Sequence, residues 1–182
     1  VTQRGEPAVP RKMIRKKLPM KCLVALLLVG CASTVLAQAK MAEDLRTELL
    51  EMGRRDQEIR ERPLPPLNSS DIQPLIEEMT KIDQANFRRL EEIINEFGWP
   101  GKHLVGEEAS TAAWLILQHA DLEQQKRYLP VLRSAVAKGE ARASNLAMTE
   151  DRILIGEGKN QLYGTQIVSD PDGKPTLHPV DD

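Results

Sequence analysis

The stretch that most constrains the fold is residues 107–119, "EEASTAAWLILQH". After its first turn this stretch is apolar on nearly every side, and a helix of that kind must be surrounded by other parts of the protein. Ala109, Ala112 and Ala113 are small enough to let neighbouring helices approach closely. We therefore predict that residues 107–119 form the central helix of the fold.

Apolar residues at helical spacing predict four further helices around it. They cover residues 41–61, 71–97, 121–138 and 140–148. The first helix lies within the segment 38–62. A proline-rich linker, 63–70, separates it from the second helix. Asp121 is expected to cap the helix that it begins, because Gln124 follows at the spacing of a capping box.

Strand character is confined to the C-terminal part of the chain. "RILI" (152–155) and "QLYGTQIV" (161–168) flank "GEGKN", which predicts a β-hairpin with a five-residue loop. Residues 169–182 are turn-rich and acidic and are expected to be a flexible tail. The predicted fold is mainly α, an orthogonal or irregular bundle of about five helices with one C-terminal β-hairpin, in one domain formed by residues 38–62 and 71–168.

The N-terminal region has the pattern of an export signal. Residues 11–21, "RKMIRKKLPMK", are strongly basic, and the apolar run "CLVALLLVGCASTVLA" follows them. The uninterrupted apolar core, 22–29, is shorter than the ~20 residues that a membrane-spanning helix needs. We therefore interpret residues 1–37 as an upstream segment plus an export signal, and expect a periplasmic or secreted protein.

Two processing sites are compatible with this signal. Cleavage near 37/38 would follow "VLA", whereas "LVGC" at 28–31 resembles a lipobox, in which Cys31 would be lipidated. The second alternative makes the protein a membrane-anchored lipoprotein. Contact with a membrane is expected only through the signal or through a lipid anchor at Cys31.

Charge and cysteine content limit the functions of the remaining chain. Residues 38–182 hold 18 of the 25 Lys and Arg residues and 26 of the 27 Asp and Glu residues, a net charge of −8. Such a domain repels nucleic acid and anionic headgroups. Both cysteines, Cys22 and Cys31, lie in the signal, so the domain has no disulfide, thiol nucleophile or cysteine metal site.

Several polar residues interrupt apolar helix faces. Asp56 lies within the apolar stripe of the first helix with Arg60 four residues later, Asn86 and Gln125 interrupt two other stripes, and His119 ends the most apolar helix. Each can be explained as an ion pair, a cap or a partner for loop backbone. Burying an unpaired polar group costs roughly 1–3 kcal/mol, however, so the set points to a shared network or a cavity.

Five motifs in this order carry a resemblance to a known family. "MGRRDQEIR", "GWP", "VGEEASTAAWLILQHAD", "LPVLRSAVAKGE" and "DRILIGEGKNQLYGTQ" resemble a bacterial family, domain of unknown function 6624, over roughly Leu45 to Gln166. That family has no established activity. Motif and stripe residues together give the candidate site: His119, Asp151 and Asp56 as catalytic candidates, and Arg60, Gln118, Asp121, Arg152, Gln161, Tyr163, Thr165 and Gln166 as ligand-binding candidates.

Three functions stay open at this point. The first is an envelope domain that binds a small polar or anionic ligand around His119 and the "YGTQ" strand, with Arg60 and Arg152 suited to an anion. The second is a hydrolase or transferase that uses His119 with a carboxylate. The third is a structural or partner-binding envelope protein. The sequence contains none of the common catalytic signatures, and we expect no cofactor and no metal.

Export makes a direct prediction about the processed protein. The chain recovered from its native cells should begin near Gln38, or at a lipidated Cys31, because the signal is removed at one of these points. Intact mass measurement distinguishes the two. Recovery of the full-length chain from the cytoplasm would contradict export.

Overall fold

The computed structural model of the chain describes residues 20–66, 69–169 and 174–181, with side chains from residue 35 onward. The chain divides into two compact units, residues 1–39 and 40–182. Helix α1, Met20–Arg60, contributes to both. Within the described ranges, no helix is both long and apolar enough to span a membrane.

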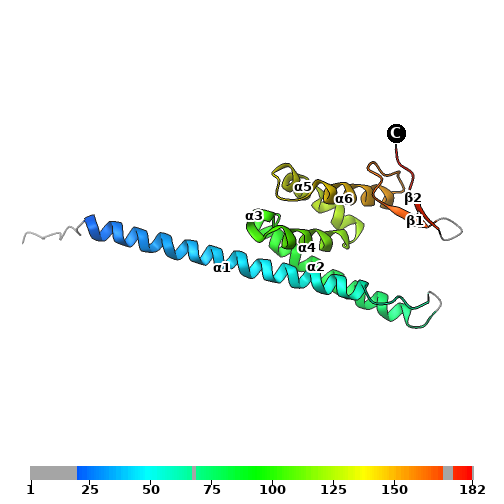
Figure 1. Cartoon of the computed structure of the whole chain (residues 1–182), viewed down its shortest axis with the longest axis horizontal. Helices are drawn as coiled ribbons and strands as arrows, with labels where there is room; N and C mark the ends of the chain where they lie inside the picture. Colours follow the sequence, from blue (N-terminus) through cyan, green and yellow to red (C-terminus); the bar gives the residue numbers. More distant parts are fainter. Residues whose placement is uncertain (1–19, 67–68, 170–173, 182) are drawn as a thin grey trace, which may run out of the picture. The chain divides into compact units, whose positions relative to one another are not determined.

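The second unit is mainly helical, as predicted, and ends in a small hairpin (Figure 1). The two strands pair antiparallel, with Ile167 opposite Leu177. After α1 the elements are α2 (Ile72–Phe97), α3 (Lys102–Val105), α4 (Glu107–Gln118), α5 (Leu122–Ala137), α6 (Ala143–Gly156), β1 (Ile167–Ser169) and β2 (Pro175–Leu177).

Helix α4 has the central position that its apolar surface predicts. Ala109, Ala113 and Leu117 have no exposed surface, and α4 packs against α2, α3 and α5. On the side of α1, a methyl group added at Gly53 would lie 2.7 Å from the Cβ atom of Ala112. The glycine therefore permits a closer approach of the two helices than any side chain would.

Helix ends also follow the sequence signals. Asp121 Oδ1 accepts from the Gln124 amide at 2.8 Å, and Gln124 Oε1 accepts from the Asp121 amide at 3.1 Å, which is the predicted capping box. Helix α2 ends before Gly98, whose φ of 75° suits glycine. Helix α5 continues through Pro130 to Ala137.

The predicted location of the hairpin is wrong. Residues 152–155 belong to α6, which extends well past the predicted 140–148, because a short apolar run fits a helix as well as a strand. "GEGKN" ends that helix: Gly158 has a φ of 74°, and the Lys159 amide donates to the Leu154 carbonyl at 2.9 Å. The real partner of β1 is β2, which comes from the segment expected to be a tail.

The burial of α4 predicts a large effect of truncating Trp114. The residue is 7% exposed, and Nε1 donates to the Asn145 carbonyl and to Thr149 Oγ1, both at 3.1 Å. Trp114→Ala should lower the free energy of unfolding by about 3–5 kcal/mol, measured by urea denaturation. Trp114→Phe, which keeps an aromatic ring, should cost less. A loss below about 1 kcal/mol for the alanine variant would place the ring at the surface.

Candidate functional site

Asp56, one turn before the end of α1, is one of two fully buried charged residues of the candidate set. Its side chain has no exposed surface, and its two carboxylate oxygens lie 2.9 and 3.0 Å from His119 Nδ1. His119 is the residue that follows α4. Gln57 Nε2 also donates to the carboxylate, at 2.6 Å. Two helix ends far apart in the sequence are thus joined through one buried carboxylate.

Arg60 connects this carboxylate to a second one. Its Nη1 lies 3.0 Å from Asp56 Oδ1 and donates to the Asp56 carbonyl at 2.9 Å. Its Nη2 donates to both carboxylate oxygens of Asp83 on α2, at 2.7 and 2.9 Å. We call Asp56, Arg60, Asp83 and His119 the Asp56 network. The pairing of Asp56 with Arg60 agrees with the sequence prediction.

The geometry fixes the hydrogen on one ring nitrogen of His119. A carboxylate only accepts hydrogen bonds, so Nδ1 carries the hydrogen that faces Asp56. In the neutral ring Nε2 then has a lone pair. Among the residues that the structure describes, none forms a hydrogen bond with Nε2. Of the two ring nitrogens, only Nδ1 is bonded to a described residue.

His119 lines a cavity of about 220 Å³. The cavity lies between α2 and the junction of α4 and α5, and the histidine side chain keeps 20% of its surface exposed. The cavity is lined by Thr80, Asp83, Gln84, His119, Ala120, Asp121 and Gln124. Asp121 therefore borders this cavity as well as capping α5.

The network contains the right atoms for a metal but also an arginine. Potential ligand atoms of Asp56, Asp83 and His119 lie within 4.8 Å of one another. Arg60 already contacts both carboxylates, so a metal ion would have to displace the guanidinium or lie beside it. Like charges at that distance repel. The donor set is better matched to arginine than to a cation from solution.

The "YGTQ" segment forms a second group, built around Asp151 of α6. The buried Asp151 carboxylate accepts from the amides of Leu162 (2.7 Å), Tyr163 (3.0 Å) and Thr165 (3.0 Å), and from the Thr165 hydroxyl (2.8 Å). Burial alone raises the pKa of Asp151, but these bonds outweigh burial and hold the pKa below its ordinary value. We call residues 161–166 with Asp151 the Asp151 loop.

Two glutamines complete the Asp151 loop. Gln161 is fully buried; its Nε2 donates to the carbonyls of Gln166 (3.1 Å) and His178 (2.7 Å), and its Oε1 accepts from the Gln166 amide. Tyr163 is 55% exposed, and the neighbouring Glu150 carboxylate raises its pKa. Of the segment expected to form a strand, 161–166 is therefore a loop whose polar groups bond to Asp151 and to backbone, and only 167–168 belong to β1.

Gln118 and Arg152 form a third contact. With the Gln118 amide oriented so that its oxygen faces α6, this oxygen accepts from Arg152 Nε at 2.6 Å and from Nη2 at 3.0 Å. Gln118 directly precedes His119, so this pair attaches α6 to the end of α4. Gln125, another interruption of an apolar stripe, donates to the carbonyls of Gln118 and Ala120.

The candidate residues thus fall into groups. Asp56, Arg60, His119 and Asp121 surround or support one cavity. In the described part of the chain, no hydrogen bond or ion pair joins His119 to the Asp151 loop, and that loop does not line the cavity. Both arginines expected to bind an anion already have protein partners. Residues of the site that the candidate set did not include are Thr80, Asp83, Gln84 and Gln124.

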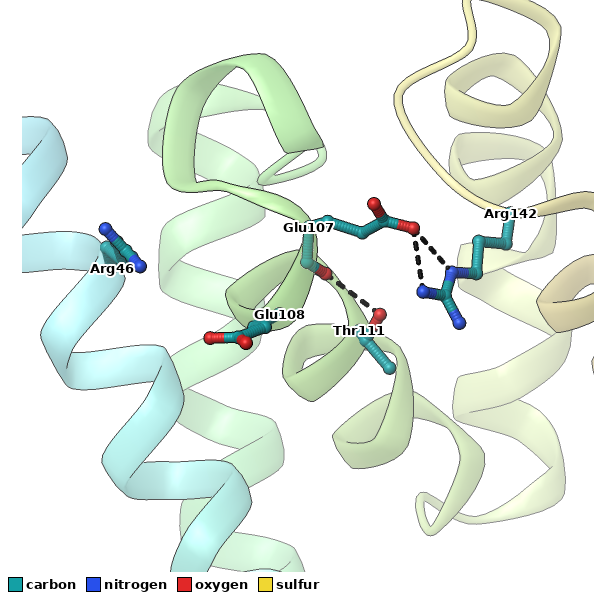
Figure 2. A pocket seen from close by; sticks show the side chains of 5 residues that line it. All are labelled: Arg46, Glu107, Glu108, Thr111 and Arg142. Carbon is teal, nitrogen blue, oxygen red and sulfur yellow. Dashed lines mark hydrogen bonds and ion pairs between the residues drawn. The ribbon is translucent and has the colours of Figure 1, made fainter.

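Another cavity, of about 660 Å³, opens between α1, α4 and the start of α6 (Figure 2). Glu107 turns toward Arg142 and pairs with it at 2.7 Å, and the Thr111 hydroxyl donates to the Glu107 carbonyl. The side chains of this ion pair are more than half exposed. Exposed pairs of this kind contribute little free energy, so the cavity beside His119 has the more constrained chemistry.

Asp151 provides a test of the loop. Asp151→Asn should lower the free energy of unfolding at neutral pH by roughly 2 kcal/mol or more, since charge-assisted bonds are lost. The folded-state pKa lies below the unfolded value of about 4. The stabilisation by Asp151 is therefore fully present above the unfolded-state pKa. It is lost as the pH falls through the folded-state pKa. Urea denaturation should show the two proteins converging below about pH 4; a pH-independent difference would contradict this.

Comparisons with known proteins agree with the motif resemblance. Neither curated proteins nor solved structures include a match to this chain. The model of a family of unknown function, DUF6624, matches residues 43–178, a span that contains the Asp56 network and the Asp151 loop. The chain therefore belongs to the family of unknown function DUF6624.

Proposed function

We propose that this protein is an exported domain that binds a small polar ligand in the cavity beside His119. The observation that carries the proposal is the orientation of the histidine ring. The Asp56 carboxylate accepts a hydrogen bond from His119 Nδ1 at 2.9 Å. His119 lines the cavity, and its Nε2 has no hydrogen-bond partner among the described residues. A ligand that donates a hydrogen bond to Nε2 would complete the network.

The cost of the arrangement supports a role beyond packing. Asp56 interrupts an apolar helix face, His119 directly follows the most apolar helix, and the Asp56 carboxylate is buried. Buried ion pairs are often no more stabilising than apolar residues of the same size. Stability alone therefore does not require the Asp56 network. A binding site that needs the His119 imidazole in a fixed orientation next to a cavity does explain it.

A catalytic role is the second candidate, and one observation favours it. A carboxylate bound to Nδ1 fixes the imidazole in the tautomer whose Nε2 can accept a proton, as in acid–base catalysis. His119 with Asp56 would then serve a hydrolase or transferase. The Asp151 carboxylate is a weaker candidate for this role, because the loop at 162–165 occupies both of its oxygens.

Export is supported by where the domain begins. The division between the two compact units follows Ala39, two residues after the expected cleavage point, and the family match begins at residue 43. Removal of residues 1–37 would leave the second unit whole. The alternative, lipidation of Cys31, would attach the same unit to a membrane by a short tether.

Substitution of His119 by asparagine separates binding from folding. The asparagine amide nitrogen can replace Nδ1 as the donor to Asp56, while the Nε2 position is lost. His119→Asn should keep the free energy of unfolding within about 1 kcal/mol of the wild type, and His119→Ala should lose more. Screening amines, amino acids, sugars and carboxylates by NMR, with the His119 ring as reporter, should yield a ligand that His119→Asn no longer binds.

His178→Ala is the matched control, because His178 lies outside the cavity. It should bind the same ligand as the wild type. If no compound of the screen perturbs His119 specifically, or if His119→Asn binds equally well, the network is structural and the proposal fails.

A further inference from the structure

We infer that the ligand of the cavity beside His119 carries a cation with N–H donors, namely a primary or secondary ammonium group. This inference rests on the proposed function and adds the chemical class of the ligand. It departs from the anionic ligand that the sequence suggested. Three properties of the cavity lead to it: the charge of its lining, the acceptor atoms that it leaves free, and the absence of Phe, Tyr and Trp from it.

The charge of the lining disfavours an anion. The carboxylates of Asp83 and Asp121 line the cavity, and no lysine or arginine does so among the described residues. Arg60 lies nearby, but its two terminal nitrogens are directed at Asp56 and Asp83. Because Arg60 balances the charge of Asp83, the remaining charge of the lining is that of Asp121, which attracts cations and repels anions.

Three side chains of the lining offer a ligand free acceptor atoms, and the side-chain amides of Gln84 and Gln124 add N–H donors beside them. The Thr80 hydroxyl donates to the Ile76 carbonyl at 2.8 Å, so it offers a ligand only its lone pairs. Asp121 Oδ1 accepts from the Gln124 amide, and its other oxygen has no partner in the described structure. With His119 Nε2 these atoms form an acceptor set. An ammonium group carries the two or three hydrogens that such a set can bind.

The lining also discriminates between kinds of cation. None of its seven residues is Phe, Tyr or Trp, so a quaternary ammonium, which binds through the faces of such rings, has no partner there. A divalent metal would need the oxygens of Asp56 and Asp83 that Arg60 already contacts. At about 220 Å³ the cavity is smaller than the ~300–1,000 Å³ of drug-sized sites. It fits a small amine or the amino end of a larger molecule.

The test is an NMR titration of the full chain with ethylammonium chloride at constant ionic strength. The His119 ring signals should shift saturably, while those of His103 and His178 act as internal references. Sodium propionate, of similar size but opposite charge, should give no saturable shift. Tetramethylammonium should bind at least about tenfold more weakly, since it has no N–H donor.

A charge-neutral variant at the cap sharpens the result. Asp121→Asn keeps a good N-cap for α5 and removes one carboxylate charge from the cavity. It should weaken ethylammonium binding by about fivefold or more. Glu123→Gln removes the same charge from the first turn of the same helix, outside the cavity lining, and should change binding by less than about twofold.

Each alternative result has a defined meaning. The ammonium inference is overturned if propionate binds saturably, or if Mg²⁺ or Zn²⁺ binds and ethylammonium does not. Either result would still support a ligand-binding cavity. Equal effects of Asp121→Asn and Glu123→Gln also overturn it, because the effect is then long-range charge. If no probe and no compound of the wider screen shifts His119, both the inference and the proposed function fail.

Discussion

The buried carboxylate of Asp56 is the group on which the candidate site depends. An isolated charge with no exposed surface would be very costly, and Asp56 avoids this cost through donors from Gln57, Arg60 and His119. Arg60 in turn holds Asp83. The requirement to satisfy one charge therefore brings together the end of α1, the middle of α2 and the end of α4. It is also what fixes the imidazole of His119 beside the cavity.

Asp151 satisfies the same requirement in a different way. Its partners are three backbone amides and a hydroxyl from one short loop, and none of them titrates near neutral pH. The carboxylate thus organises the Asp151 loop and has no free oxygen directed at a cavity. These two buried aspartates have different roles because Asp56 faces a histidine and an arginine, whereas Asp151 faces the backbone and a hydroxyl of one loop.

Local patterns predicted much of the fold. The apolar surface of residues 107–119 predicted a central helix, the spacing of Asp121 and Gln124 predicted the capping box, and the separation of Asp56 and Arg60 predicted their pairing. These features depend on a few neighbouring residues. The hairpin was misplaced because its second strand, β2, is short, exposed and without an apolar pattern, so only pairing with β1 defines it.

The site was harder to predict because its contacts are non-local. Asp56 and His119 are 63 positions apart, and Arg60 and Asp83 are 23 apart. Stripe interruptions identified Asp56 and His119 individually, but nothing in the sequence separated them from Asp151 and Tyr163. Asp83 has a weak signal, since it lies three residues before the buried Asn86 on α2. Which buried polar residues face one another depends on how the helices pack.

The tautomer of His119 tests the central claim most directly. Long-range ¹H–¹⁵N correlation spectra of the neutral ring distinguish a hydrogen on Nδ1 from one on Nε2. The structure predicts the Nδ1–H form for His119, and a loss of this preference in Asp56→Asn, whose amide can also donate. An Nε2–H form, or an averaged tautomer in the wild-type protein, would mean that Asp56 does not orient the ring and would contradict the account.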